Sequence, residues 1–359
     1  MKKWRVAGIN FDHLHMGDLL REVYNHAFAE IVGVCDLDQN KMQSAISNFN
    51  IPNNLVFNNL DKCILETNPD LVITCPATAD HANYLEKISK YPVHILIEKP
   101  FAPNTSEAKR MIESMKIHNK KLAINWPLAW YPCHVKAKKI LEKGFIGELR
   151  EVHFYDGNRG PLYHLADKIE VSEEEVEKKK KDSWWYKKEL GGGSLLDYLG
   201  YGTTLGTWFF NGKKPETVTT ITDKVPNIEV DQHSITICRY GKYLSKFETK
   251  WGTFSDPWTT QPQPKCGFVL VCEGGTISSY DFEKYISIQT KKNRDLEKID
   301  VDELPVGKRS PVEYVLDCIE NDKLIEGPLN PEFYLIGQRI VDTAYQSSFE
   351  GKTLNLING

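Results

Sequence analysis

In the first 125 residues, short continuous apolar runs alternate with segments whose apolar residues recur at helical spacing. The apolar runs predict strands at residues 4–9, 30–35, 70–75, 93–97 and 121–125. The segments between them predict helices near residues 16–28, 38–48, 60–67, 79–90 and 105–118. Strands that are apolar throughout have both faces covered. This alternation therefore predicts a parallel, doubly wound α/β sheet, and such sheets bind ligands at the carboxyl ends of their strands.

The pattern changes after Pro127. A helix is predicted at 133–143, a strand at 148–156, and a series of alternating strands between residues 216 and 290. Helices near 310–320 and 331–347 follow. Alternation of apolar and polar positions is typical of antiparallel sheets with one covered face. We therefore expect two domains: an α/β domain over residues 1–125, and an α+β domain with a largely antiparallel open sheet over 126–359.

Composition narrows the class of protein. A hydrophobic content of 41% and a charged content of 26% are ordinary for a globular chain. The net charge of −4 argues against nucleic acid or a membrane surface as the main partner. No apolar run is long enough to span a bilayer, and the apolar stretch near the start is too short for a signal peptide. The eight cysteines form no Cys-x-x-Cys pair and lie mostly in apolar runs, which predicts buried, reduced thiols in a cytoplasmic protein.

The segment RVAGINFDHLHMGDLL, residues 5–20, joins the first predicted strand to the first predicted helix. A dinucleotide-binding loop carries Gly-x-Gly-x-x-Gly at this place, and here Gly8, Asn10 and His13 fill the three glycine positions. Gly8 supplies the tight turn, and asparagine is the commonest other residue at positive φ. The segment predicts a modified cofactor loop in which His13 lies across the pyrophosphate or pushes the helix outward. An ordinary strand-to-helix turn is the alternative.

His13 and His15 are also potential metal ligands. A metal site needs about four ligands, and we find no further set nearby in the sequence. We therefore expect no metal at this place.

Asp36 ends the second predicted strand, 28 residues after Gly8. At this position a carboxylate accepts hydrogen bonds from the adenosine ribose hydroxyls, and it repels a 2′-phosphate. No arginine follows in the segment DLDQNK. The sequence therefore favours NAD over NADP, although an aspartate at a strand end is also an ordinary turn residue.

Four segments together resemble a known family. They are VCDLD after the second strand, CPATADH after the next, Glu98-Lys99-Pro100 after an apolar strand, and a triple glycine before a helix that carries Asp197 and Tyr201. In this order they are similar to the glucose–fructose oxidoreductase, inositol dehydrogenase and rhizopine-catabolism (Gfo/Idh/MocA) family, along essentially the whole chain. The resemblance implies a Rossmann dinucleotide-binding domain and NAD(P)-dependent oxidoreduction of sugars, polyols and their derivatives.

The resemblance implies Lys99, Asp197 and Tyr201 as catalytic residues. The ammonium of Lys99 would stabilise charge on the reacting oxygen. Asp197 and Tyr201 are four residues apart and share a helix face, so Asp197 would orient the tyrosine that exchanges the proton. Ser194 with Asp197 also fits a Ser-x-x-Asp capping box, which would make Asp197 purely structural.

The family resemblance, together with the positions at strand ends, implies two further sets of site residues. The expected cofactor-binding residues are Gly8, Asn10, His13, Asp36, Cys75, Pro76, His81, Glu98 and Asn125. The expected substrate-binding residues are Lys99, Trp126, Arg159, His164, Trp185 and Tyr201, with Tyr186 as a further wall residue. A tryptophan can stack on a sugar face. Each aromatic residue has core packing as its alternative, and the charged run at 170–183 is most simply a solvated helix.

The sequence thus predicts an enzyme that uses NAD, and less readily NADP, to oxidise or reduce a sugar, polyol or related cyclic substrate. Two alternatives stay open: a catalytically silent sugar or dinucleotide sensor, and NAD-assisted glycoside cleavage. The open sheet needs a cover, and related proteins cover it with another subunit, so we expect a homodimer or homotetramer.

Overall fold

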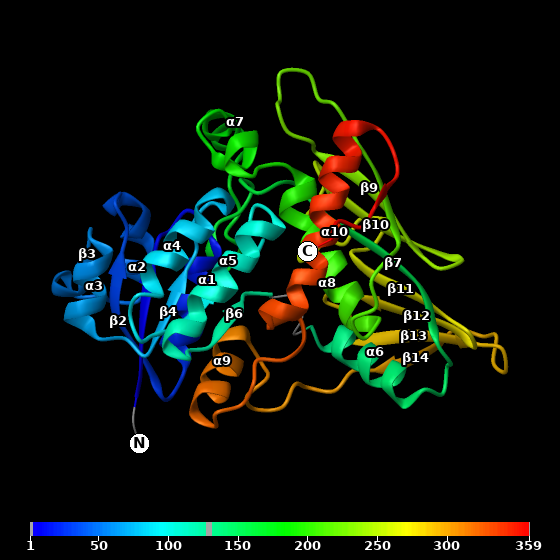
Figure 1. Cartoon of the computed structure of the whole chain (residues 1–359), viewed down its shortest axis with the longest axis horizontal. Coiled ribbons are helices and arrows are strands. Elements are labelled where there is room, and N and C mark those ends of the chain that lie inside the picture. The colour runs from blue at the N-terminus through cyan, green and yellow to red at the C-terminus, as the bar shows by residue number, and fades with distance from the viewer. Residues whose placement is uncertain (1–2, 127–130, 359) are drawn as a thin grey trace. The chain divides into compact units, whose positions relative to one another are not determined.

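The computed structural model describes residues 3–126 and 131–358, and the chain divides into two compact units (Figure 1). The first unit contains Met1–Trp126, His164–Ser172 and Pro305–Glu332, and the second contains the remainder. The division thus differs from a single boundary near residue 125, because two later segments belong to the first unit.

The first unit is built on a six-stranded parallel sheet of order β3-β2-β1-β4-β5-β6. Its strands are β1 Trp4–Ile9, β2 Ala29–Cys35, β3 Val56–Phe57, β4 Leu71–Thr74, β5 His94–Ile97 and β6 Leu122–Ile124. Its helices are α1 His15–Asn25, α2 Gln43–Asn48, α3 Leu60–Thr67, α4 His81–Ile88, α5 Thr105–Met115 and α9 Pro311–Glu320. This order is that of dinucleotide-binding sheets, with the strand order reversing between β1 and β4.

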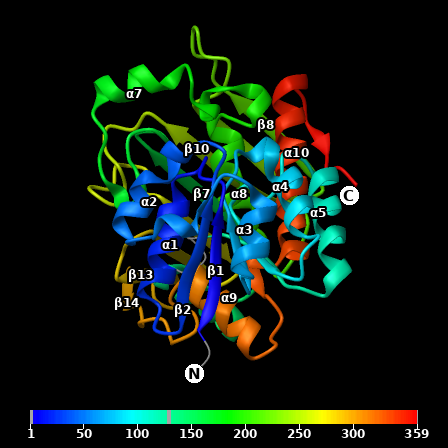
Figure 2. The ribbon, with the colours of Figure 1, turned by 90° about the vertical axis from the view of Figure 1, so that its left-hand side faces the viewer.

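Figure 2 shows α1 and α2 on one side of this sheet and α3, α4 and α5 on the other. Both faces are therefore covered, which explains the uninterrupted apolar runs of the central strands. The five strands predicted in this region are confirmed. Strand β3 was missed, because a pairing of two residues leaves no periodic signal.

The second unit is built on a nine-stranded sheet of order β14-β13-β12-β11-β7-β10-β9-β8-β15. Its strands are β7 Leu149–Asn158, β8 Thr217–Thr222, β9 His233–Tyr240, β10 Tyr243–Trp251, β11 Gly267–Cys272, β12 Gly275–Tyr280, β13 Tyr285–Thr290, β14 Glu297–Asp300 and β15 Leu354–Asn355. Its helices are α6 Pro132–Lys143, α7 Glu173–Lys180, α8 Ser194–Phe209 and α10, which spans Pro331–Glu350. Only the pairing of β7 with β10 is parallel among the described strands of this sheet, so the predicted largely antiparallel sheet is confirmed.

Helix α8 packs directly on the inner face of this sheet. A Cβ atom at Gly202 would lie 2.3 Å from the ring of Phe154, and one at Gly206 would lie 2.9 Å from the ring of Phe247. On another side of α8, a Cβ atom at Gly337 of α10 would lie 2.3 Å from Oγ1 of Thr204. Small residues therefore set how closely α8 approaches its neighbours, and α8 is buried along nearly its whole length.

Helix α7 and the cysteines have the surroundings that the sequence predicts. In α7, Lys178 pairs with Glu174 at a spacing of four residues, as expected for a solvated charged helix. All eight cysteines are buried and free. Within the described residues, every helix is too short or too polar to cross a membrane.

Candidate functional site

The loop after β1 keeps the shape of a dinucleotide loop with only one glycine. A Cβ atom at Gly8 would lie 3.1 Å from Sδ of Met16 and 3.3 Å from a methyl group of Leu20, so glycine lets α1 pack closely on β1. Asn10 has a φ of 65°, the left-handed conformation that the second glycine of the motif would adopt. The sequence prediction that asparagine replaces this glycine is consistent with the backbone.

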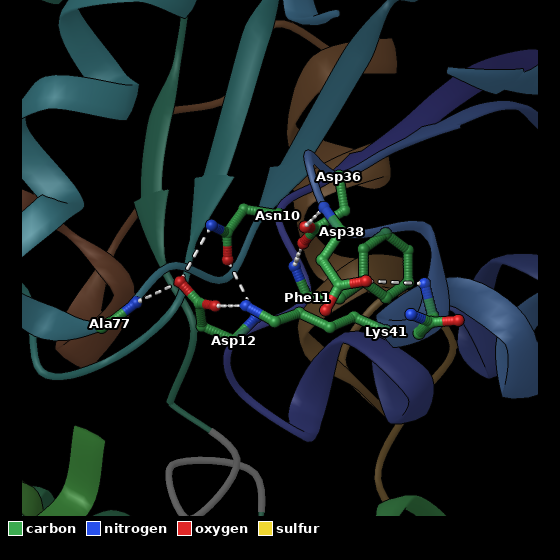
Figure 3. A network of polar contacts seen from close by, with 8 residues as sticks. Asn10, Phe11, Asp12, Asp36, Asp38, Lys41 and Ala77 are labelled. Atoms are coloured by element: carbon green, nitrogen blue, oxygen red, sulfur yellow. Dashed lines mark hydrogen bonds and ion pairs between the residues drawn. The ribbon is translucent and has the colours of Figure 1, made fainter. Parts of the chain in front are cut away.

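Asp36, which directly follows β2, is hydrogen-bonded to that loop (Figure 3). Its Oδ2 atom accepts the backbone N–H of Phe11 at 2.7 Å, and its Oδ1 atom accepts the backbone N–H of Asp38 at 2.8 Å. Each carboxylate oxygen has a further lone pair, so these bonds leave room for ribose hydroxyls. Asp36 therefore has a structural role in addition to the cofactor role that the sequence predicts.

Asp12 was missed by the sequence analysis, although it is the centre of the network drawn in Figure 3. Its Oδ2 atom accepts hydrogen bonds from Nδ2 of Asn10 at 2.9 Å and from the backbone N–H of Ala77 at 3.2 Å. Its Oδ1 atom lies 2.5 Å from Nζ of Lys41. Asp12 thus connects the loops that follow β1, β2 and β4. A carboxylate inside a phosphate-binding loop was the signal that could have identified it.

His13 caps the start of α1. Its backbone N–H donates to the carbonyl oxygen of Cys75 at 3.0 Å, and its Nδ1 atom accepts the backbone N–H of His15 at 3.2 Å. The residue is buried, and burial together with the charge of His15 lowers the pKa of His13 well below 6.5. A neutral ring with its proton on Nε2 satisfies this geometry.

His15 and Glu98 form the main ion pair at the carboxyl edge of the sheet. Nδ1 of His15 lies 2.9 Å from Oε1 of Glu98, and Oε2 of Glu98 accepts a hydrogen bond from Nδ2 of Asn125 at 2.7 Å. Burial would lower the pKa of His15, but the charge of Glu98 raises it overall. Burial would raise the pKa of Glu98, but the charge of His15 lowers it overall. Each side chain therefore favours the ionised form of the other.

His13, His15 and Glu98 bring potential metal-ligating atoms within 4.8 Å of one another. Glu98 comes from the end of β5, so the search for ligands near the two histidines in sequence could not find it. In this arrangement Nδ1 of His13 accepts a backbone N–H, and His15 and Glu98 pair with each other. A metal bound through these same atoms would compete with these bonds.

The residues after β4 hold one another through backbone contacts. Both ring nitrogens of His81 lie 3.0 Å from carbonyl oxygens, Nε2 from that of Pro76 and Nδ1 from that of Phe101. Cys75 is buried, and burial raises the pKa of its thiol well above 9. The structure thus gives Cys75, Pro76 and His81 positioning roles at the edge where the sequence predicts cofactor contacts.

Lys99, Trp126 and His164 all belong to the first unit. Lys99 follows Glu98 directly, and Trp126 follows Asn125. Burial and the charges of His15, Lys168 and Lys99 lower the pKa of His164 to about 3. The structure therefore brings His164 to the group formed by His15 and Lys99.

The segment that carries His164 is fixed on α1. Nε and Nη2 of Arg21 bind the carboxylate of Asp167 at 3.1 and 2.7 Å, and the backbone N–H of Asp167 donates to Oδ1 of Asp18. A Cβ atom at Gly17 would lie 2.5 Å from that of Ala166. These contacts explain why residues 164–172 join the first unit.

In the second unit, the triple glycine lies against the backbone of Trp185. A Cβ atom at Gly192 would lie 2.2 Å from the carbonyl oxygen of Trp185, and Gly193, with a φ of 107°, donates its N–H to the same oxygen at 3.0 Å. No other residue type would fit this approach without displacing the backbone. The glycines therefore fix the chain immediately before α8.

Asp197 and Tyr201 lie one turn apart in α8, and each is 5% exposed. The prediction of a capping box between Ser194 and Asp197 is wrong, because the partner of Ser194 lies outside the helix. The hydroxyl of Ser194 donates to Oδ2 of Asp231 at 2.7 Å, and the same oxygen accepts the backbone N–H of Leu195 at 2.8 Å. Asp231 therefore caps α8 in place of a residue within the helix, and the sequence analysis missed it.

The remaining expected wall residues also lie in the second unit. The guanidinium of Arg159 lies 4.4 Å from the ring centroid of Tyr163, and its backbone N–H donates to Oδ1 of Asp256. The ring of Trp185 stacks on that of Trp184 at 4.5 Å, and Tyr186 lies 5.5 Å from Trp251. Residues 127–130 of the segment that follows Trp126 lie outside the described residues.

The carboxyl edge of the first sheet fits a dinucleotide. Three buried polar atoms there have no hydrogen-bond partner among the described residues: Oγ1 of Thr74, Oγ1 of Thr78 and Oδ1 of Asn125. A buried polar atom without a partner is costly, and a ligand rich in hydroxyl and amide groups would satisfy it. Together with Asn10 and Asp36, these atoms match the chemistry of a nicotinamide nucleotide.

Comparison with known families agrees with this geometry. Residues 3–126 match the model described as "Oxidoreductase family, NAD-binding Rossmann fold", and residues 134–278 match the "GFO/IDH/MocA C-terminal domain". An uncharacterized oxidoreductase of Schizosaccharomyces pombe is 34% identical over 113 residues, which are 32% of this chain. The aligned stretch covers 29% of that relative's own length.

Solved structures share the fold over the whole chain. The aldose-aldose oxidoreductase of Caulobacter crescentus, complexed with glycerol, has a TM-score of 0.78 at 16% identity and covers 99% of this chain and 100% of its own. Levoglucosan dehydrogenase, complexed with NADH and levoglucosan, has a TM-score of 0.76 at 14% identity, with coverage of 99% and 100%. At these identities the likeness concerns the fold alone.

Proposed function

The chain belongs to the GFO/IDH/MocA oxidoreductase family, and from that premise we propose that it transfers hydride between NAD and a hydroxyl-bearing carbon of a sugar, polyol or related cyclic substrate. One observation carries the proposal: Gly8 and Asn10 keep the backbone of a dinucleotide loop, and Asp36 lies at the end of β2 beside that loop.

The protein's part in binding the cofactor follows from the edge of the first sheet. Asp36 would accept the ribose hydroxyls while it holds Phe11, and the start of α1 would face the pyrophosphate. The free Oδ1 of Asn125 would accept an amide proton, while its Nδ2 keeps Glu98 in place. His13, Cys75, Pro76 and His81 would position this edge. Bound NAD supplies the hydride chemistry.

We assign the catalytic roles to Lys99, Asp197 and Tyr201. The ammonium of Lys99 would stabilise negative charge on the reacting oxygen, and the hydroxyl of Tyr201 would exchange the proton. Asp197, one helical turn before Tyr201, would orient that hydroxyl. No metal is required for this chemistry.

The substrate class rests on the family and on the aromatic residues near the motifs. Trp126 and Trp185 offer flat faces for a sugar ring, and Arg159 and His164 offer polar groups for its hydroxyls. The structural relatives named above were solved with glycerol and with levoglucosan, which agrees with a polyhydroxylated substrate.

We also propose a homodimer or homotetramer in the cytoplasm. The outward-facing side of the second sheet carries exposed isoleucines that a second copy would cover. The eight buried, free thiols favour a reducing compartment.

A two-stage experiment tests the proposed function. NADH is first titrated into the protein and binding is followed by nicotinamide fluorescence, with ATP as a control ligand. A panel of sugars and polyols is then screened with NAD, and their carbonyl forms with NADH, by absorbance at the reduced-nicotinamide band. Binding followed by turnover is expected. A protein that fails to bind NADH would refute the proposal, and binding without turnover across the panel would favour the sensor alternative.

A further inference from the structure

The pair formed by Asp12 and Lys41 lies next to the residue that the proposed function assigns to the adenosine ribose. Lys41 lies in the turn after β2, five residues beyond Asp36, and the same turn contains Asp38. Figure 3 shows the side chain of Lys41 reaching back to Asp12 in the loop after β1. One ammonium and three carboxylates therefore gather at this corner of the first unit.

In dinucleotide-binding folds, a cation at this place affects the choice between NAD and NADP. The turn that follows the second strand is where a basic side chain accommodates the 2′-phosphate of NADP. Lys41 is in that turn and its side chain is 42% exposed, so it has the charge and the freedom that this contact needs. Lysine carries the same charge as arginine, so the lack of an arginine in the segment DLDQNK does not by itself remove the cation.

In this structure Lys41 already forms an ion pair. Its Nζ atom lies 2.5 Å from Oδ1 of Asp12, and that aspartate is itself fixed by hydrogen bonds from Asn10 and Ala77. Asp38 is occupied differently, because its Oδ1 accepts the backbone N–H of Asn40. Asp12 is therefore the carboxylate that pairs with the ammonium.

We propose that Asp12 determines cofactor choice because it holds Lys41 in an ion pair. Lys41 then does not bind the 2′-phosphate of NADP, which would require a cation at this place. The preference for NAD then has two causes: repulsion from Asp36, and the neutralisation of Lys41 by a residue of the glycine loop. This inference rests on the proposed dinucleotide site.

Releasing Lys41 should therefore improve NADP binding. In Asp12→Asn the charge disappears, while the amide oxygen can still accept the N–H of Ala77. A charge-assisted bond from Lys41 to the 2′-phosphate should lower the ratio of the NADPH to the NADH dissociation constant by about tenfold or more. If the substitution distorts the loop and weakens the binding of both nucleotides equally, the ratio of their dissociation constants does not change.

Four proteins make the test specific: the unmodified chain, Asp12→Asn, Asp12→Asn with Lys41→Met, and Asp38→Asn. NADH and NADPH are titrated into each by fluorescence at one fixed ionic strength. Asp38→Asn is the matched control, because it removes one carboxylate at the same corner without releasing Lys41, and asparagine still caps the turn. The ratio should fall in Asp12→Asn, return in the double variant, and change little in Asp38→Asn.

The outcomes separate the two proposals. An unchanged ratio in Asp12→Asn would overturn the role of Asp12, and a fall that persists in the double variant would show that Lys41 is not the cation. Asp12→Ser, which also keeps an acceptor, serves if the asparagine variant does not fold. If the unmodified protein binds neither nucleotide, the proposed function fails and this inference fails with it. If it binds NADH and the ratio stays fixed, only the inference fails.

Discussion

Nδ1 of His15 lies 2.9 Å from Oε1 of Glu98, which joins the first residue of α1 to the residue after β5. Glu98 also accepts the amide of Asn125 after β6, so one buried carboxylate connects three elements of the first unit. The start of a helix disfavours a cation, and Glu98 compensates the charge of His15 there.

Replacing Glu98 by glutamine should destabilise the protein by about 2–3 kcal/mol, because it leaves the charge of His15 without a partner in a largely buried site. The free energy of unfolding in urea at pH 5.5 measures this. Glu174→Gln in α7 is the control: its pair with Lys178 is exposed, and the expected change is below about 0.5 kcal/mol. Equal effects of the two variants would contradict a structural role for the His15–Glu98 pair.

The His15–Glu98 pair predicts a pH range in which it stabilises the protein most. The pKa of His15 is raised, so its stabilising contribution is full below the ordinary value of 6.5 and is lost as the pH rises through the raised value. The pKa of Glu98 is lowered, so its contribution is present above the ordinary value of 4.5 and is lost as the pH falls through the lowered value. The stability difference between the unmodified protein and Glu98→Gln should therefore be largest between pH 4.5 and 6.5.

Asp36→Ala should narrow the preference for NADH over NADPH, since it removes the carboxylate that repels a 2′-phosphate. It should also lower the free energy of unfolding by about 1–2 kcal/mol, because the N–H groups of Phe11 and Asp38 lose their acceptor. Fluorescence titration and urea unfolding measure the two effects. Equal affinities of the unmodified protein for both nucleotides would remove the ribose assignment of Asp36.

Lys99→Ala and Tyr201→Phe should each lower kcat by about 10²–10⁴-fold while NADH affinity stays close to that of the unmodified protein. Turnover is measured with a substrate found in the screen. Groups that act as one unit are not additive, so the double variant should fall well short of the product of the single effects.

The two single variants have different consequences if they remain active. Near-normal turnover in Tyr201→Phe would move proton exchange to another group, and His164 or His233 would be tested next. Near-normal turnover in Lys99→Ala would count against the proposed chemistry itself, since the charge on the reacting oxygen would have no cation assigned to it.

Glu22 on α1 supplies a second pH dependence, in which stability falls as the pH rises. Burial raises its pKa to about 7, against hydrogen bonds from Ser310 and Val312 that lower it. Because the folded state holds this proton more tightly, the contribution of Glu22 falls as the pH rises from 4.5 to 7. Glu22→Gln should therefore stabilise the protein by about 3 kcal/mol at pH 8 and not at pH 4.5.

Urea unfolding at both pH values measures this difference. Glu66→Gln, on an exposed part of α3, is the matched control and should show no such difference. A Glu22→Gln variant that is equally stabilised at pH 4.5 and pH 8 would contradict a titration of Glu22.

The proposed assembly predicts a sedimentation coefficient above that of a monomer at micromolar concentration. Ile221 of β8 and Ile235 of β9 are partners in the sheet register, face outward and are 73% and 37% exposed. Ile221→Lys should weaken association, because the charge would be buried against a second copy. Leu324→Lys changes an equally exposed leucine of the first unit and should not. A monomeric unmodified protein would contradict the prediction.

The central elements could be predicted because their signals are local. The strand from Trp4 to Ile9 is apolar except for Arg5, and the positive φ of Asn10 belongs to the turn itself. The same holds for Gly191 and Gly193 before α8, whose positive φ angles no other residue adopts as readily.

The network around the cofactor loop could not be predicted, because it depends on partners far apart in sequence. Asp12 meets Lys41 and Ala77, which are 29 and 65 residues away, and His15 meets Glu98 across 83 residues. Polar residues in turns carry no periodic pattern that reveals such pairing. At Ser194 a local capping motif was present and gave a wrong prediction. The hydroxyl of Ser194 instead donates to the carboxylate of Asp231, 37 residues away.

The inclusion of residues 305–332 in the first unit has a consequence for how the protein is made. Glu22 of α1 accepts the backbone N–H of Val312 at the start of α9, a residue that the ribosome adds 290 positions later. The first unit therefore cannot be completed while residues 1–126 alone have emerged, and the side of α1 that α9 covers must wait for most of the chain. An expression fragment cut at residue 126 would retain that exposed surface permanently, so chaperone dependence and aggregation are expected of the fragment more than of the whole protein.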